Sequence, residues 1–158
     1  MWRIYGPPPH TPRNQALIPA ASFSASLFPA SRALTPALFP VIDSDGIMKP
    51  AVLILVEEAL EAGLTHVVIV VSPHHLSDFR AIFEDGVSPA ELARLPPRMR
   101  SYSHKIKEMG TRVTLHVQAR QLGLGHAVLD ARSALKVKFL TRPSLFPTPP
   151  SRNVIPPP

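Results

Sequence analysis

The sequence predicts an α/β fold with a parallel sheet, and three observations support this prediction. Strand-like and helix-like segments alternate along the middle of the chain. The segment His66–Val71 (HVVIVV) is short, β-branched and apolar on both faces, which is typical of a strand covered on both sides. Apolar residues recur at helical spacing just before it, at Val52, Leu53, Val56, Ala59 and Leu60. Strands and helices that alternate in this way are joined by right-handed crossovers.

The first half of the folded region is expected to open with a strand at Ala16–Ala20, although Pro19 lies within it. A long irregular segment, Ser22–Pro40, follows. Lys49-Pro50 then starts a helix, because proline is tolerated in the first helical turn. We expect Gly63 to end this helix.

The second half continues the alternation of helices and strands. Ser88 and Glu91 form a capping-box pattern, with proline at the first helical position. Gly110 is expected to stop the helix that precedes it. The remaining predicted elements are helices at Leu76–Phe83, Tyr102–Met109 and His126–Leu135, and a strand at Val113–Val117, where apolar residues alternate.

Length and proline content divide the chain into three parts. Its 158 residues suffice for one domain with one core. Of its 20 prolines, four lie between Ala51 and Arg142, and the others lie in the two flanks. We therefore expect a Pro-rich, disordered N-terminus over residues 1–14, a folded domain over 15–136 and a Pro-rich, disordered tail over 137–158.

Composition excludes several classes of site and partner. The absence of cysteine excludes disulfides, thiolate zinc sites, iron–sulfur clusters and a cysteine nucleophile. The net charge is +6, but the densest basic stretch, Arg94–Arg112, has a single aromatic residue and is interpreted as a solvated helix face rather than a nucleic-acid surface. No apolar run reaches the roughly 18 residues that span a bilayer. We expect no nucleic-acid or membrane partner and a cytoplasmic protein, with organelle targeting left open.

Ligands of parallel α/β sheets usually lie beyond the carboxyl ends of the strands. The first strand leads into a loop with three hydroxyls, Ser22, Ser24 and Ser26, where a phosphate-binding loop would have glycines and a cation. An ordinary Ser-rich connection is the first interpretation of this loop. Gln118 ends a later strand, and its amide both donates and accepts, as recognition of a base edge requires. A plain strand-to-helix connection through Gly123 explains that segment equally well.

No metal site is predicted from the residues. The adjacent side chains of His74 and His75 rarely converge on one ion, and no third ligand is evident. Asp43–Gly46 is interpreted as a turn. A calcium loop that started at Asp43 would need a glutamate at position 54, which is Ile54.

Several segments occur in an order that is similar to the N-terminal half of the bacterial-type UTP–glucose-1-phosphate uridylyltransferases, within the sugar-phosphate nucleotidyltransferase family. These segments are Ile18–Ala21, Leu27–Ser31, Leu38–Asp43, Lys49–Gly63, His66–Pro73 and Gly123–Val128. The resemblance implies a partial nucleotidyltransferase domain over 15–136. It also implies a Rossmann-like, mostly parallel, three-layer sheet that is incomplete.

The resemblance further implies where a nucleotide would bind. By position, Ala20 and Ala21 would line the base and ribose, Gln118 would read the uracil edge, and Gly123 would permit close approach of the backbone. Ser22 would also belong to the nucleotide-binding residues. The implied reaction converts UTP and glucose 1-phosphate to UDP-glucose and pyrophosphate with Mg²⁺. Catalysis of such a transfer rests on positioning and on neutralisation of charge.

Two departures from the family pattern concern charge. Ser26 stands where the family has its catalytic arginine, and Pro36 stands where it has a phosphate-binding lysine. Arg32 and Lys49 match cations that the family already has, so neither is an evident substitute. The aspartate that binds the metal on a later strand has no counterpart. From Lys136 onward the sequence departs from the family, as in a truncated gene product, after a frame change or in an intron read as coding.

We therefore expect a degenerate, truncated member that binds a uridine nucleotide weakly and does not transfer a uridylyl group alone. The alternative is a non-catalytic nucleotide-binding or protein-interaction fragment. A half-sheet exposes an open edge and apolar faces, so we also expect poor solubility, a protein partner or a homo-oligomer.

Overall fold

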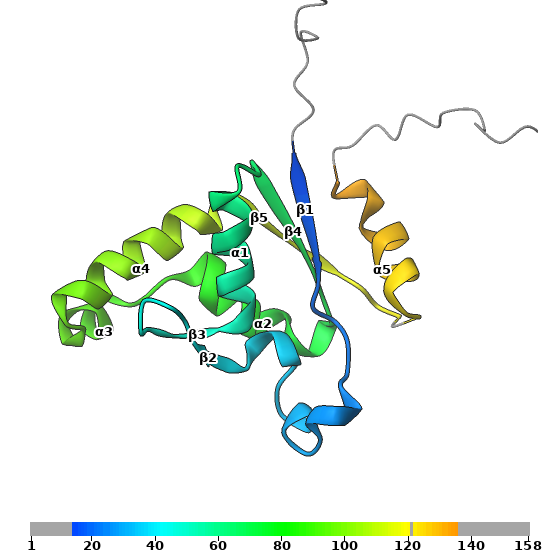
Figure 1. The fold of residues 1–158 in the computed structure, drawn as a ribbon, viewed down its shortest axis with the longest axis horizontal. Helices are drawn as coiled ribbons and strands as arrows, with labels where there is room; N and C mark the ends of the chain where they lie inside the picture. Colours follow the sequence, from blue (N-terminus) through cyan, green and yellow to red (C-terminus); the bar gives the residue numbers. More distant parts are fainter. Residues whose placement is uncertain (1–13, 121, 136–158) are drawn as a thin grey trace, which may run out of the picture.

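The computed structural model describes residues 14–120 and 122–135. The predictions of disorder for residues 1–14 and 137–158 lie outside this part of the chain, apart from Asn14. The described residues form three layers, with a central parallel sheet and helices on both faces (Figure 1). This architecture confirms the α/β prediction.

The central sheet has three parallel strands in the order β1-β4-β5. They are β1 (Gln15–Pro19), β4 (His66–Val71) and β5 (Val113–Val117). In this register Ile69 lies between Ile18 and Leu115. Residues 67–71 of β4 have no exposed surface, so the prediction of a strand buried on both faces is confirmed.

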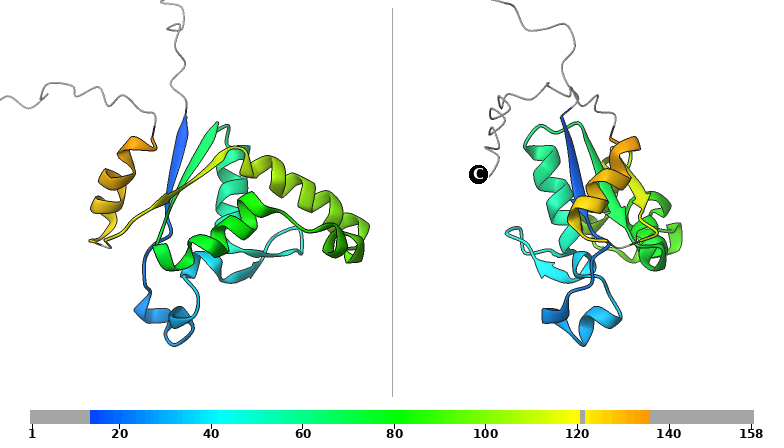
Figure 2. Two further views of the ribbon diagram at one scale, coloured as in Figure 1. Left: turned by 180° about the vertical axis from the view of Figure 1, so that it is seen from behind. Right: turned by 90° about the vertical axis from the view of Figure 1, so that its right-hand side faces the viewer.

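Helices α1 (Ala51–Glu61), α2 (Leu76–Arg80) and α4 (Pro97–Gly110) cover one face of the sheet. Helix α5 (Leu124–Asp130) covers the other face (Figure 2, right). Because successive strand side chains alternate between faces, Val67, Ile69 and Val71 join the first core, while Val68 and Val70 pack against Ala127 and Ala131. Strand β4 therefore contributes to both cores.

Several predicted helix ends agree with the structure. Pro50 immediately precedes α1, and Gly63 follows its end with a φ of +88°. Helix α3 (Pro89–Arg94) starts with the predicted capping box, in which Ser88 Oγ accepts from Glu91 N at 3.3 Å and Glu91 Oε2 accepts from Ser88 N at 3.1 Å.

Other helices differ from the predictions. The helix expected over Leu76–Phe83 is α2 followed by one π-helical segment, η5 (Ala81–Asp85), and both Phe79 and Phe83 still reach the core. Helix α4 begins at Pro97 rather than Tyr102, since proline fits the first turn. Helix α5 begins at Leu124, before the expected start at His126, and ends at Asp130, where a 3₁₀ turn, η6 (Ala131–Ser133), replaces its expected last turn.

Gly110 is the last residue of α4 and has no positive φ, so its conformation does not stop the helix. Its lack of a side chain matters for packing. A Cβ at this position would lie 2.0 Å from the carbonyl oxygen of Phe83, far inside van der Waals contact. Glycine thus allows α4 to approach η5 closely.

A small antiparallel hairpin, which no sequence pattern predicted, lies between β1 and α1. Its strands are β2 (Pro40–Ile42) and β3 (Met48–Pro50), joined by the turn predicted at Asp43–Gly46. Each strand has only three residues, which is too short for an alternating pattern to be recognised. The preceding irregular segment contains the 3₁₀ turns η1 (Ala25–Leu27), η2 (Ala30–Arg32) and η3 (Pro36–Leu38). Among the described helices, none has both the length and the apolar character that a membrane span requires.

Candidate functional site

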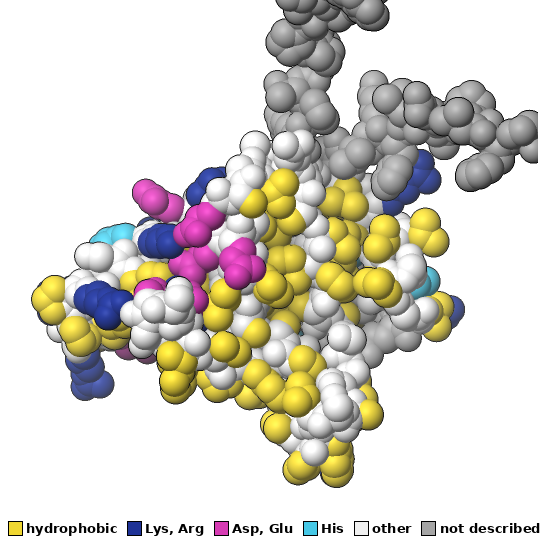
Figure 3. Space-filling view, viewed as in Figure 1, with side chains coloured by type: hydrophobic (Ala, Val, Ile, Leu, Met, Phe, Trp, Pro, Cys, Tyr) yellow, Lys and Arg dark blue, Asp and Glu magenta, His cyan; other side chains and the backbone are white. Residues whose placement is uncertain are grey.

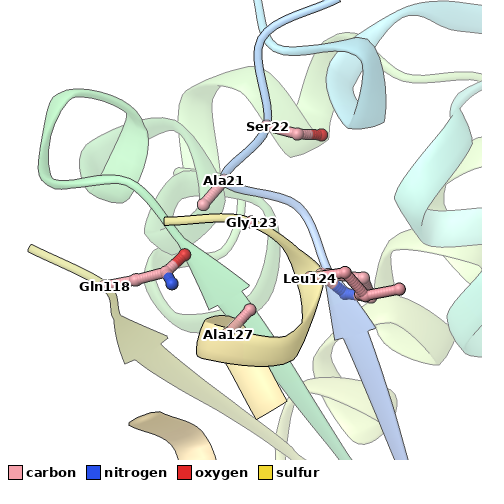
Figure 4. A pocket seen from close by; sticks show the side chains of 7 residues that line it. Ala21, Ser22, Gln118, Gly123, Leu124 and Ala127 are labelled. Atoms are coloured by element: carbon pink, nitrogen blue, oxygen red, sulfur yellow. The ribbon is translucent and has the colours of Figure 1, made fainter. Parts of the chain in front are cut away.

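A pocket of about 180 Å³ lies where the chain leaves β1 and β5 and enters α5 (Figure 4). It is lined by Pro19, Ala21, Ser22, Gln118, Gly123, Leu124 and Ala127. Four of the five residues predicted to bind a nucleotide are in this set, although they come from segments about 100 residues apart in the chain. The carboxyl ends of the parallel strands bring them together.

Main-chain hydrogen bonds fix the exit from β1. Ala20 N donates to the carbonyl oxygen of Val70 at 2.7 Å, which extends the pairing of β1 with β4 by one residue. The buried hydroxyl of Thr35 donates to the Ala20 carbonyl at 2.9 Å. Ala20 packs into the core with α1 and is not among the pocket-lining residues, whereas Ala21 lines the pocket. The two adjacent alanines therefore have different surroundings.

Hydrogen bonds hold both the backbone and the side chain of Gln118. Its backbone N–H donates to Val71 O at 2.9 Å, and its side-chain Nε2 lies 2.7 Å from His126 Nδ1. The side chain is 2% exposed, so its polar atoms are screened from bulk water. A buried primary amide of this kind offers both a donor and an acceptor to a ligand.

Gly123 leads into α5 with a φ of +93°, a conformation that favours glycine. A Cβ built on Gly123 meets no atom within 4 Å. Its carbonyl oxygen accepts from Ala127 N at 3.1 Å, which begins the helix. The backbone at Gly123 is thus open to a ligand on the pocket side.

The Ser-rich loop contributes only part of itself to the pocket. Ser22 lines it, whereas the hydroxyls of Ser24 and Ser26 are hydrogen-bonded to each other at 3.0 Å and are not among the residues that line it. Pro36 starts η3, also outside the lining. All seven lining residues are uncharged, so no cation of the lining faces the pocket.

Lys49 is engaged elsewhere. Its side chain is 3% exposed, and its Nζ lies 2.6 Å from Asp43, 2.9 Å from Asp45 and 2.8 Å from Glu57. Burial alone would lower the pKa of Lys49, but the hydrogen bonds to the three carboxylates outweigh it and raise the pKa above its usual value. The charge of Lys49 is therefore neutralised and is not available to a phosphate.

Other groups complete this cluster. Lys105 Nζ lies 2.9 Å from Glu57 Oε1, and the Lys49 ammonium lies 5.0 Å from the centre of the Tyr102 ring. Burial, followed by the charge of Glu57, raises the pKa of Tyr102 to about 12. Acidic side chains gather where α1 and α4 meet, as Figure 3 shows in magenta. Sequence reasoning interpreted Asp43 and Asp45 only as turn residues and did not find this cluster.

The described residues do not fit a magnesium ion at the pocket. The lining contains no carboxylate, and no three His, Asp or Glu side chains within residues 14–120 and 122–135 are grouped to hold a metal. His75 instead lies 3.1 Å from Asp78 within its own turn.

Comparison with known proteins relates this chain to a family. No family model matches the chain. A UTP–glucose-1-phosphate uridylyltransferase of Streptococcus pyogenes is 31% identical over 123 residues, which cover 76% of this chain and 38% of that protein. The chain is a partial relative of the UTP–glucose-1-phosphate uridylyltransferases. A second uridylyltransferase, from Streptococcus pyogenes serotype M3, is 32% identical over the same shares of both chains.

Solved structures support the fold. UDP-glucose pyrophosphorylase in complex with UDP-glucose matches with a TM-score of 0.59 and 22% identity, over 78% of this chain and 42% of that one. Its apo form matches with a TM-score of 0.62 and 23% identity, over 78% and 43%. The three-layer architecture is thus that of the pyrophosphorylase nucleotidyltransferase fold over the covered part. The chain spans 38% of the length of the uridylyltransferases that it matches.

Proposed function

We propose that the pocket between the β1 exit and α5 binds the uracil base and ribose of a uridine nucleotide, and that this chain alone does not transfer a uridylyl group. The convergence of Ala21, Ser22, Gln118 and Gly123 on one pocket carries the proposal. The complex of a pyrophosphorylase of similar fold with UDP-glucose supports the choice of ligand class.

The chemistry of Gln118 suits the uracil edge. Uracil presents one N–H donor between two carbonyl acceptors, and a primary amide can accept from the first while donating to one of the others. Because the side chain is 2% exposed, a base that leaves one of its polar atoms unpaired loses about 1–3 kcal/mol. This difference corresponds to a preference of roughly tenfold or more for uracil over cytosine.

The pocket volume favours the base over the phosphates. Pockets that enclose a whole small molecule usually exceed about 300 Å³, and this one has about 180 Å³. The lining supplies no cation for a triphosphate. Each missing hydrogen bond to a charged group removes roughly 1.5–3 kcal/mol, so the absence of an arginine at Ser26 and of a lysine at Pro36 predicts weak binding.

The same absence argues against catalysis. In-line transfer at the α-phosphorus depends on groups that neutralise the charge developing on the phosphate oxygens. Ser26 is exposed and bonded to Ser24, and Lys49 is held by three carboxylates. Neither can supply that charge in this arrangement.

Titration of the full chain with uridine, followed by NMR, tests the binding proposal. We expect shifts of the Gln118 side-chain amide that saturate at millimolar uridine. In the variants the backbone amide of Gly123, which also lines the pocket, is followed instead. Gln118→Leu should abolish its saturable shift, whereas Gln15→Leu, the same change at the opposite end of the sheet, should not. Absence of any shift in the wild-type protein at millimolar uridine would reject the proposal.

A separate assay tests the absence of transfer. The full chain is incubated with UTP, glucose 1-phosphate and Mg²⁺, and pyrophosphate release is measured. We expect release no faster than in a control without protein. Release clearly above that control would refute the non-catalytic part while leaving the binding part in place.

A second candidate function, as a protein-interaction module, is favoured by exposed apolar side chains on and just before α5. Leu122, Leu124 and Leu129 on and before α5 are 67%, 65% and 71% exposed. A surface of this kind often binds another protein or a second copy. Sedimentation of the wild-type chain and of Leu129→Glu tests this, because only an interacting surface would make association depend on Leu129.

A further inference from the structure

One short hydrogen bond joins two of the three segments that form the pocket. Gln118 follows β5, and His126 lies in the first turn of α5. The distance from Gln118 Nε2 to His126 Nδ1 is 2.7 Å. Gln118 is 2% exposed and His126 is half-buried, so bulk water competes little for this contact.

The direction of this bond follows from the chemistry of its atoms. An amide nitrogen donates and does not accept, so the ring Nδ1 of His126 must accept. The imidazole is then neutral and carries its proton on Nε2. With its nitrogen bound to the ring, the Gln118 amide turns its oxygen toward Ala21 and Gly123, as Figure 4 shows.

A primary amide can be reversed end for end without changing its shape, but the reversal exchanges donor and acceptor. In the observed orientation the pocket receives an acceptor, which suits the N3–H of uracil. In the reversed orientation it would receive an NH₂ group, which suits the unprotonated N3 of cytosine. Whatever fixes the amide orientation therefore decides which pyrimidine the pocket prefers.

We propose that His126 is a positioning residue that fixes the orientation of the Gln118 amide and thereby sets the preference of the pocket for uracil over cytosine. This inference rests on the proposed function, since Gln118 must be the group that contacts the base. His126 itself does not line the pocket, so its effect passes through Gln118.

Two variants of the full chain distinguish the effect of the hydrogen-bond acceptor at His126 Nδ1 from the effect of the rest of the imidazole ring. His126→Leu removes the acceptor. His126→Asn keeps an oxygen close to the position of Nδ1. In the wild type, cytidine should have a dissociation constant about tenfold larger than that of uridine. In His126→Leu the two dissociation constants should differ by no more than about twofold. We expect His126→Asn to restore most of the preference.

The free protein gives an independent readout. Nitrogen NMR of the His126 ring in the wild-type chain should show an unprotonated Nδ1, coupled to the Gln118 side-chain amide. Protonation at Nδ1 at pH 8 would overturn the inference even if His126→Leu fails to fold. A purely structural role would not predict rescue of the base preference by asparagine.

The outcomes distinguish the two proposals. If wild-type protein does not bind uridine, the proposed function fails, and with it the role of His126 in selectivity. If wild-type protein binds uridine and His126→Leu keeps the full preference over cytidine, the binding function stands and this inference is wrong. If His126→Leu loses the preference and His126→Asn regains it, both are supported.

Discussion

Replacement of Lys49 by methionine is the sharpest test of how the hairpin is held to the helices. Methionine keeps most of the length of the side chain and removes its charge. The Lys49 Nζ joins Asp43 and Asp45 of the hairpin turn to Glu57 of α1. The substitution therefore leaves those carboxylates facing one another without their shared cation.

The expected loss is about 3 kcal/mol in the free energy of unfolding. Removing one partner of a buried ion pair costs about 3–5 kcal/mol, because the remaining charge stays desolvated. The low end applies here for two reasons. Glu57 keeps its contact with Lys105 at 2.9 Å, and Asp45, at 38% exposure, can recover hydration.

Lys105→Met provides a matched control. Lys105 binds the same carboxylate, Glu57, but its side chain is 48% exposed. Exposed ion pairs contribute at most about 1 kcal/mol. Urea unfolding at pH 7, followed by circular dichroism, should therefore show a loss at least about twice as large for Lys49→Met as for Lys105→Met.

The pH dependence of the free energy of unfolding provides a second check on the Lys49→Met prediction. Burial alone would raise the pKa of Glu57, but the hydrogen bonds from Lys49 and Lys105 outweigh it and hold the pKa below its ordinary value of 4.5. A carboxyl with a lowered folded pKa stabilises the protein above its ordinary pKa and loses that contribution as the pH falls. The wild type should thus lose stability below about pH 4.5, and its advantage over Lys49→Met should shrink there. Equal losses in the two lysine variants at pH 7, or an advantage that grows in acid, would refute this reasoning.

Gly110 and Gly125 form another matched pair, because both are helical glycines. Gly110→Ala should lower the free energy of unfolding by about 2 kcal/mol, since the new Cβ would lie 2.0 Å from Phe83 O. Gly125→Ala, where the new Cβ meets open space, should raise the free energy of unfolding by up to about 1 kcal/mol. Equal urea midpoints for the two variants would contradict this. Ser88→Ala should cost α3 about 1 kcal/mol of protection against amide hydrogen exchange, and unchanged protection would contradict the capping box. Uridine and UTP should bind with dissociation constants within about threefold of each other, because the pocket lining is uncharged, and a strong preference for UTP would contradict this.

The parts of the fold that sequence patterns predicted correctly are those with local causes. A run of apolar, β-branched residues favours a strand covered on both faces, and residues 67–71 of β4 are such a run. The Ser88 capping box depends on residues three positions apart. The hairpin β2–β3 has three-residue strands with mostly exposed side chains, so no pattern could indicate it.

The candidate site was predictable to the level of strand ends but not of single side chains. The end of β1 lies at Pro19 rather than at Ala20, and neighbouring side chains along a strand point to opposite faces. A one-residue difference therefore decides whether Ala20 or Ala21 lines the pocket. The hydrogen bond between Gln118 and His126 could not be predicted from the sequence for a different reason, because it depends on how the chain turns between β5 and α5.

The shape of the pocket depends on main-chain hydrogen bonds, whereas binding of a triphosphate depends on cationic side chains. The pocket can therefore form although its lining carries no positive charge. Main-chain bonds to Val70 and Val71 of β4 place the β1 exit and Gln118, so those positions tolerate changes of side chain in the loops. A grip on phosphates requires cationic side chains instead. Ser26 lies outside the pocket lining, in a turn where its hydroxyl is hydrogen-bonded to that of Ser24. The charge of Lys49 is neutralised by carboxylates, among them Asp43 of the hairpin turn. A single Ser26→Arg substitution would thus add a cation without the surroundings that direct it, and it should leave the affinity for UTP close to that for uridine.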